Sequence, residues 1–142
     1  MTQITPHFSY EELTRTDTGL ENDPGIAMAG NMARLADTLE QIREVLGVPL
    51  KVNSGYRSEE VNARVGGVKT SAHLFCRAAD IVPQGMPLEE AFESIRKSGI
   101  EYDQWILEPT WIHVGIACAR ERSRQMDLIA TMRGNKMEYK PA

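Results

Sequence analysis

Two histidines and one aspartate have the residue types and positions to bind a metal ion. His73 is the last residue of the segment Ser71-Ala72-His73, Asp80 lies seven positions later, and His113 lies much farther along the chain. A catalytic zinc ion commonly takes three protein ligands from imidazole and carboxylate groups and keeps a fourth position for water. His73, Asp80 and His113 are therefore sufficient for such a site if the fold brings them together.

Each candidate ligand also has an ordinary structural interpretation. A single histidine on a strand is more often a core or surface side chain than a ligand, and Asp80 by itself fits a carboxylate at a strand end. Cys76 offers a different ligand set, because an ionised thiolate binds zinc strongly and this cysteine lies three positions after His73. The residues alone leave open whether His73 pairs with Asp80 or with Cys76.

The segments around the first two candidates have the patterns of loops and strands. Residues 68–77 are expected to form a loop that leads into a strand at 78–82, so His73 and Asp80 come from adjoining elements. Residues 50–54 alternate apolar and polar side chains and predict another strand. A loop followed directly by a strand can bring two side chains to one point across so short a gap.

A β-hairpin is expected to supply the third ligand. Strands at 104–108 and 111–117 are separated only by Pro109 and Thr110. Successive side chains on a strand point to opposite faces. One face then carries Trp111, His113 and Gly115, and the other carries Ile112, Val114 and Ile116. His113 should therefore leave the sheet on the side opposite the aliphatic core.

Helices account for most of the remaining pattern. Apolar residues recur at spacings of three and four along 27–46, which predicts an amphipathic helix that Gly47 and Pro49 end. Ser9 and Glu12 have the spacing of a capping box at the start of a short first helix. Further helices are expected at 59–65 and between Pro87 and Gly99, and residues 17–26 are expected to be a loop. Together these elements predict an α+β fold in which a small antiparallel sheet packs against helices.

The last segment, residues 118–142, differs from the rest in charge. It holds six Lys and Arg residues against three Asp and Glu residues. Met126, Ile129 and Met132 recur at a weak helical spacing, so we expect a solvated, charged helix without a role in any site. The chain is therefore predicted to be one domain, 1–142, with its core at about residues 8–117 and a charged tail after it.

Composition limits the class of protein. A chain of 142 residues with 42% hydrophobic and 25% charged residues fits one globular domain. Its net charge of −4, with the basic excess confined to the tail, argues against a general nucleic-acid binder. No apolar run approaches the roughly 20 residues of a membrane span, so no membrane insertion is expected. Cys76 and Cys118 are expected to be free thiols.

Several separated motifs together resemble one known family. They are Ser54-Gly55-Tyr56-Arg57-Ser58, Asn62, Val65-Gly66-Gly67, Ser71-Ala72-His73, Ala78-Ala79-Asp80-Ile81 and Trp111-Ile112-His113-Val114. In this order they resemble the zinc D-Ala-D-Ala carboxypeptidases and phage endolysin-type peptidases of the hedgehog/DD-peptidase fold, peptidase family M15. The resemblance extends from about Phe8 to Ile116 and does not include the tail.

The resemblance implies a role for each motif residue. It implies that His73, Asp80 and His113 bind Zn²⁺, that Arg57 lies beside the substrate carbonyl or carboxylate, and that Ser71 lies near the bound peptide. The permanently charged guanidinium of Arg57 suits stabilisation of the oxyanion that forms when water attacks a peptide carbonyl. Trp111, two residues before His113, is a candidate wall of the substrate cleft.

Two positions depart from the family pattern. The acidic general base of relatives often precedes the last histidine ligand by three residues, where this chain has Thr110. Glu108 is our candidate for the catalytic base, and Asp103 is a weaker substitute. Cys76 stands where the pattern around the first ligand usually has glycine.

Two functions follow as hypotheses. The first is a monomeric zinc metallopeptidase that hydrolyses a bond in the stem peptide of bacterial peptidoglycan, either as a carboxypeptidase or as an endolysin-type endopeptidase. The second is a phage or prophage structural or wall-binding module that keeps the fold with little or no turnover, which Thr110 and Cys76 would favour. Met1 to His7 have neither a basic start nor an apolar run, so we expect synthesis in the cytoplasm and access to the wall by phage-type release.

Overall fold

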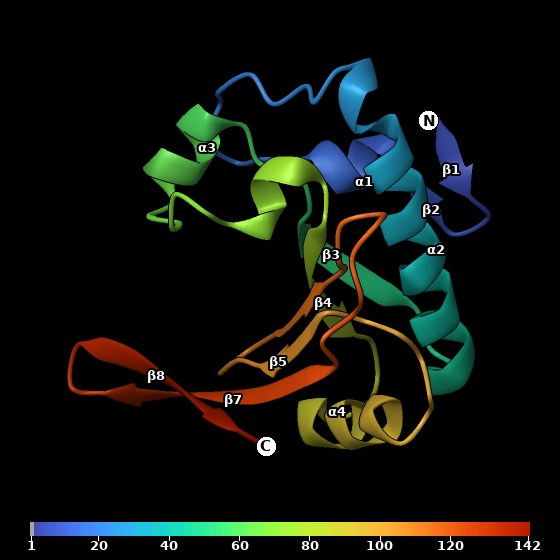
Figure 1. Ribbon diagram of the computed structural model, residues 1–142, viewed down its shortest axis with the longest axis vertical. Helices are drawn as coiled ribbons and strands as arrows, with labels where there is room; N and C mark the ends of the chain where they lie inside the picture. The colour runs from blue at the N-terminus through green and yellow to red at the C-terminus, as the bar shows by residue number, and fades with distance from the viewer. Residues whose placement is uncertain (1) are drawn as a thin grey trace.

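A six-stranded sheet organises the computed structural model, which describes residues 2–142 (Figure 1). The strands lie in the order β3-β4-β6-β5-β7-β8. Their bounds are β3 Leu50–Ser54, β4 Ala78–Pro83, β5 Gln104–Leu107, β6 Ile112–Gly115, β7 Met126–Arg133 and β8 Lys136–Pro141. Strands β1 (Gln3–Thr5) and β2 (Phe8–Ser9) form a separate small antiparallel pair.

Helices complete the α+β fold that the sequence predicts. They are α1 Tyr10–Thr14, α2 Ala29–Leu46, α3 Glu59–Arg64 and α4 Leu88–Arg96, with 3-10 turns η1 Ile26–Met28 and η2 Ala72–Phe75. The expected capping box is present, since Ser9 and Glu12 each accept a hydrogen bond from the backbone N–H of the other. The long helix ends as expected at Gly47, which has a left-handed φ of 69°.

The sheet is mixed, because the antiparallel pairing that the sequence predicts holds for all neighbouring strands except one pair. β5 and β7 are parallel, with Ile106 opposite Leu128, whereas the other neighbouring strands are antiparallel. β6 ends beside the start of β5, since Gly115 is opposite Gln104, and the chain then passes to the other side of β5 to begin β7. β7 therefore runs antiparallel to β6 and parallel to β5.

The expected tail helix is also wrong, because residues 118–142 supply β7 and β8. The two strands extend as a long ribbon, coloured orange to red in Figure 1. Gly134, with a φ of 60°, makes the tight turn between them. Apolar residues at 126, 128, 130 and 132 alternate with Asp127, Thr131 and Arg133, and only Ile129 breaks this strand pattern. The tail is therefore part of the sheet rather than an appendage to a core that ends at residue 117.

The two faces of the sheet have different roles. Ala79, Ile81, Trp105, Ile112 and Val114 are fully buried on the face that packs against α2 and α4. The opposite face carries one row of side chains across four strands, because the register pairs Asp80 with His113, His113 with Ile106 and Ile106 with Leu128. His113 thus leaves the sheet opposite the aliphatic core, as the alternation predicts.

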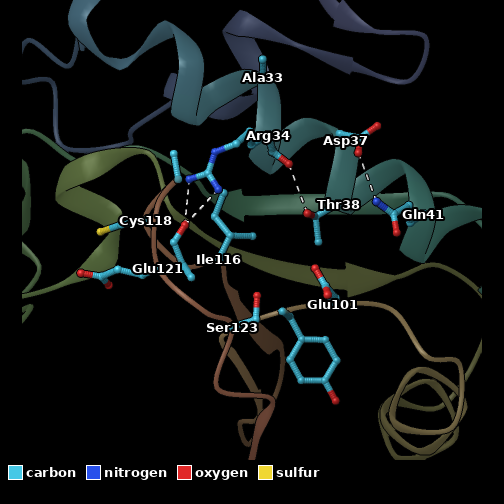
Figure 2. A pocket seen from close by; sticks show the side chains of 13 residues that line it. Ala33, Arg34, Asp37, Thr38, Gln41, Glu101, Ile116, Cys118, Glu121 and Ser123 are labelled. Carbon is cyan, nitrogen blue, oxygen red and sulfur yellow. Dashed lines mark hydrogen bonds between the residues drawn. The ribbon is translucent and has the colours of Figure 1, made fainter.

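The loop after β6 is fastened to α2 by Arg34. Its Nη1 and Nη2 atoms donate hydrogen bonds to the carbonyl of Ala117 at 3.0 and 2.8 Å (Figure 2). The hollow beside this contact has a volume of about 490 Å³ and contains none of the three candidate metal ligands. None of the helices between residues 2 and 142 has both the length and the apolar character needed to cross a bilayer.

Candidate metal centre

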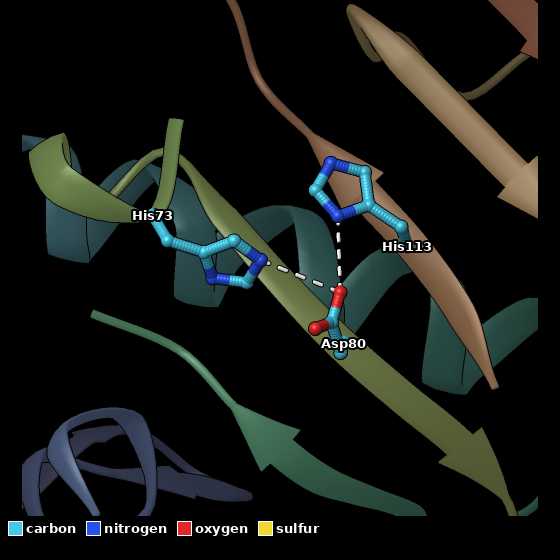
Figure 3. A group of neighbouring side chains, drawn as sticks. All are labelled: His73, Asp80 and His113. Carbon is cyan, nitrogen blue, oxygen red and sulfur yellow. Dashed lines mark hydrogen bonds and ion pairs between the residues drawn. The ribbon is translucent and has the colours of Figure 1, made fainter. Parts of the chain in front are cut away.

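His73, Asp80 and His113 converge on one point (Figure 3). His73 comes from η2, Asp80 from β4 and His113 from the adjacent strand β6. Asp80 Oδ1 lies 3.0 Å from His113 Nδ1 and 3.4 Å from His73 Nε2. One donor atom from each residue lies within 4.8 Å of the others. The structure therefore assembles the set of side chains that the spacing suggested.

Local sequence fixes the direction of the His73 ring. Ser71 caps the 3-10 turn, and its hydroxyl oxygen accepts a hydrogen bond from the backbone N–H of His73 at 3.2 Å. The ring Nδ1–H donates to the carbonyl of Gly55 at 2.6 Å, which leaves Nε2 directed at Asp80. Gly55 has to be glycine, because a Cβ there would lie 2.4 Å from the carbonyl oxygen of Leu13.

The donor set fits a zinc ion. Since His73 Nδ1–H is bound to a carbonyl, Nε2 faces Asp80 Oδ1, and the two atoms need a proton or a metal ion between them. A zinc ion can take the place of that proton. Two ligands at zinc bonding distance and a tetrahedral angle lie roughly 3.4 Å apart, close to the two separations from Asp80, 3.0 and 3.4 Å.

Asp80 is held as a carboxylate. Burial alone would raise its pKa, but hydrogen bonds from His113 and His73 and their positive charge hold the pKa well below its ordinary value. Arg57 Nη2 donates to the other carboxylate oxygen, Oδ2, at 3.3 Å. Asp80 is only 8% exposed. The position therefore supplies a negative ligand atom at any neutral pH.

Arg57 is fixed in turn by three partners. In addition to the bond to Asp80, its Nε donates to the Ser54 hydroxyl at 3.1 Å and its Nη1 donates to the side-chain Oδ1 of Asn62 at 3.4 Å. Gly67 leaves room for this arrangement, because a Cβ there would lie 2.0 Å from Asn62 Oδ1 and 3.1 Å from Arg57 Nη1. Ser54 and Asn62 thus hold Arg57 in place, and Arg57 in turn holds the carboxylate of Asp80.

A cleft of about 820 Å³ opens over the ligand-bearing face of the sheet. Its lining includes His113, Ser71 and Glu108, whereas His73 and Arg57 are not in the lining. Trp111 does not line it either, although its backbone carbonyl accepts a hydrogen bond from Glu108 N–H at 3.0 Å. Ser71 and Glu108 therefore share a cleft with a metal ligand, whereas Trp111 lies opposite Glu108 on the neighbouring strand and outside the cleft lining.

Glu108 follows β5 and is the better placed of the two candidate bases. Burial raises the pKa of its carboxyl, and the charge of Asp80 adds to this, while His113 and the Tyr139 hydroxyl oppose it. Asp103 also lines the cleft, but its two carboxylate oxygens accept hydrogen bonds from the Arg124 side chain at 2.9 and 2.7 Å. That ion pair lowers the pKa of Asp103 and occupies its oxygens.

Cys76 does not join the cluster. It is 1% exposed within the hydrophobic core, and burial raises the pKa of its thiol to about 12. It takes a left-handed φ of 56° at the end of η2, a conformation that glycine adopts without strain. This conformation gives a physical reason for the glycine that the family pattern usually has there.

Comparison with known families agrees with the geometry. The model of the family described as peptidase M15 matches residues 6–115, which include all three candidate ligands. The chain belongs to the peptidase M15 family. The zinc D-Ala-D-Ala carboxypeptidase of Streptomyces albus G is 32% identical to this M15 chain over 78 residues. That match covers 53% of the M15 chain and 31% of the Streptomyces protein, so the chain spans less than a third of this relative's length.

One cleft residue of this M15 chain was not predicted from the sequence. Tyr139 lies in β8, beyond the matched segment, and contributes its side chain to the cleft beside Glu108. The expectation of a charged tail helix concealed it. The alternation in residues 126–133 and the Gly134-Asn135 turn were the features that could have revealed a hairpin reaching the site.

Proposed function

We propose that this chain is a zinc-dependent peptidase that hydrolyses a peptide bond in the stem peptide of bacterial peptidoglycan. The observation that supports it best is the convergence of His73, Asp80 and His113 beside a cleft that also holds a buried carboxylate, Glu108. Membership of the M15 family and the match to a zinc D-Ala-D-Ala carboxypeptidase support the same reaction class.

His73, Asp80 and His113 would hold the zinc ion through Nε2, a carboxylate oxygen and Nδ1. When bound, zinc would supply Lewis-acid polarisation of the scissile carbonyl and lower the pKa of water toward about 7. The hydrogen bond from His73 to Gly55 and that from Arg57 to Asp80 orient two of these ligands before any metal arrives.

Glu108 would act as the general base and then the general acid. Its carboxylate takes a proton from the attacking water and returns it to the leaving amine. Burial and the neighbouring Asp80 raise its pKa, which brings the group closer to the pH at which proton transfer in both directions is efficient. Its place in the cleft lining makes it accessible to a bound peptide.

Arg57 would act mainly by holding Asp80 in place. A guanidinium has five N–H donors, and Asp80, Ser54 and Asn62 occupy three of them. The family resemblance also implies a contact with a substrate carbonyl or carboxylate, but Arg57 lies behind Asp80 and outside the cleft lining. Ser71, which lines the cleft, would contact the peptide, whereas Trp111 lies outside the lining.

The wall-binding module is the competing proposal. Its support is Thr110, which replaces the acid that relatives often carry three residues before the last histidine ligand. Glu108 removes the need for that acid, because it lines the cleft from the end of β5.

We also propose that the protein reaches the wall by phage-type release.

Incubation with purified muropeptides, followed by mass analysis of the products, tests the proposed function. We expect cleavage by the zinc-loaded protein, loss of cleavage with a chelator, and recovery when zinc is added back. The mass lost identifies the bond, because release of a terminal alanine and an internal cut give different fragments. Intact muropeptides with zinc-loaded, folded protein would favour the binding module instead.

A further inference from the structure

Tyr139 and Glu108 lie in one row of the sheet. Leu107 is opposite Ile129 in the parallel β5–β7 pair, so the next residues, Glu108 and Ala130, continue that register. Ala130 is in turn the partner of Tyr139 in the β7–β8 pair. Side chains in one row across neighbouring strands point to the same face. Glu108 and Tyr139 therefore flank Ala130 on the face that carries the metal ligands.

Ala130 leaves the space between them open. It is 7% exposed, in contrast to the mostly exposed residues of the outer half of β7. Two strand spacings separate the outer backbones by roughly 10 Å, a span that a tyrosine and a glutamate can bridge when the middle side chain is a single methyl group. A larger residue at 130 would lie between the phenol and the carboxylate.

Other observations agree with a contact between Tyr139 and Glu108. Both residues line the same cleft. The Tyr139 hydroxyl lowers the pKa of Glu108, and the Glu108 carboxylate, after burial, is among the causes that raise the pKa of Tyr139. Tyr139 is 52% exposed at the cleft, so it has no large packing role of its own.

We propose that Tyr139 is a positioning residue for Glu108, whose phenol O–H donates to the carboxylate and holds it toward the bound peptide. This inference rests on the proposed function, in which Glu108 is the base. It gives the C-terminal hairpin a part in the reaction, since the phenol belongs to a residue of β8. Freed from that hydrogen bond, the carboxylate would occupy other rotamers and meet the water in a productive geometry less often.

A double-mutant cycle tests the contact without turnover. Tyr139→Phe, Glu108→Ala and the double variant are unfolded in urea as metal-free proteins. We expect the unfolding midpoint of the double variant to fall by clearly less than the sum of the two single shifts, because both substitutions remove one hydrogen bond. Additive shifts would overturn the proposed contact.

The same variants are then compared as zinc-loaded proteins on muropeptides. We expect Tyr139→Phe to lower kcat by roughly tenfold, with KM changed by less than about twofold, and to have no further effect in the Glu108→Ala background. Tyr10→Phe is the matched control, because it removes a phenol that donates to another carboxylate, Asp23, at 2.7 Å outside the cleft. Its kcat should equal that of the wild type.

The outcomes separate this inference from the proposed function. Wild-type kcat in Tyr139→Phe, with an inactive Glu108→Ala variant, would overturn only the role of Tyr139. Full activity in Glu108→Ala would overturn the proposed base and the role of Tyr139 together. If the zinc-loaded wild type cleaves nothing, the proposed function fails and the positioning role fails with it, whatever the unfolding cycle gives.

Discussion

Replacement of His73 by alanine is expected to lower kcat/KM on muropeptides by about 10³-fold or more. His73 supplies one of three donor atoms, and its ring is already directed at Asp80 by the hydrogen bond to Gly55. The variant keeps only Asp80 and His113, too few ligands to hold a catalytic zinc ion tightly. The measurement is the initial rate of fragment release, followed by mass spectrometry in zinc-buffered solution.

His7→Ala is the control for this variant. His7 is an exposed histidine whose Nδ1 lies 2.8 Å from Glu40, on the surface rather than in the cluster. Its replacement should leave the rate unchanged. Retention of most of the wild-type rate by His73→Ala, with the same bound zinc, would mean that the catalytic metal lies elsewhere or that none is needed.

Glu108→Gln is expected to lower kcat by about 10²- to 10⁴-fold while the bound zinc stays at the wild-type level. The amide is nearly the same shape as the carboxylate but cannot accept the proton of the attacking water. Because Glu108 lies outside the donor cluster, the substitution should leave metal affinity intact. Steady-state kinetics and metal analysis on the same preparation check both statements.

Asp103→Asn is the matched control for Glu108→Gln. Both carboxylates line the cleft, but Asp103 is paired with Arg124 and is not expected to transfer protons. We expect less than about a tenfold loss of kcat for Asp103→Asn, due to the broken ion pair. The opposite result would be a loss of about 10²-fold or more in Asp103→Asn together with an active Glu108→Gln variant. Asp103 rather than Glu108 would then be the general base.

The elements of the central fold could be predicted because local patterns determine them. The apolar spacing along α2 and the glycine after it predict a helix that the structure contains. The hairpin of β5 and β6 follows from two strand patterns with two residues between them, and the alternation sends His113 away from the core. These patterns depend only on which side of an element is buried.

The end of the chain could not be placed because its pairing is non-local. Met126, Ile129 and Met132 suit a helix by spacing, yet hydrogen bonds to β5 and β8 stabilise β7 as a strand. β5 lies well before β7 in the sequence, so its pairing with β7 leaves no mark on the local pattern. The parallel pairing arises because the chain passes from β6 to the far side of β5 before it forms β7, and local patterns do not encode that placement. The error in the tail carried over to the site, since it excluded Tyr139 from the cleft.

The candidate site was predictable as residue types and order rather than as geometry. The motifs indicated His73, Asp80, His113 and Arg57, but their spacing could not show that Arg57 lies behind Asp80 instead of in the cleft lining. That arrangement depends on Gly67, whose missing Cβ admits the Asn62 and Arg57 side chains. A close approach between a glycine backbone and two packed side chains has no local sequence pattern.

The metal content of the purified protein tests the central claim most directly. Inductively coupled plasma mass spectrometry is applied to the wild type and to His113→Ala after exchange into zinc-buffered solution. We predict about one zinc ion per chain in the wild type and a large loss in the variant, because Nδ1 of His113 is one of three converging donor atoms. Equal zinc content in the two proteins, or none in either while both remain folded, would contradict the account.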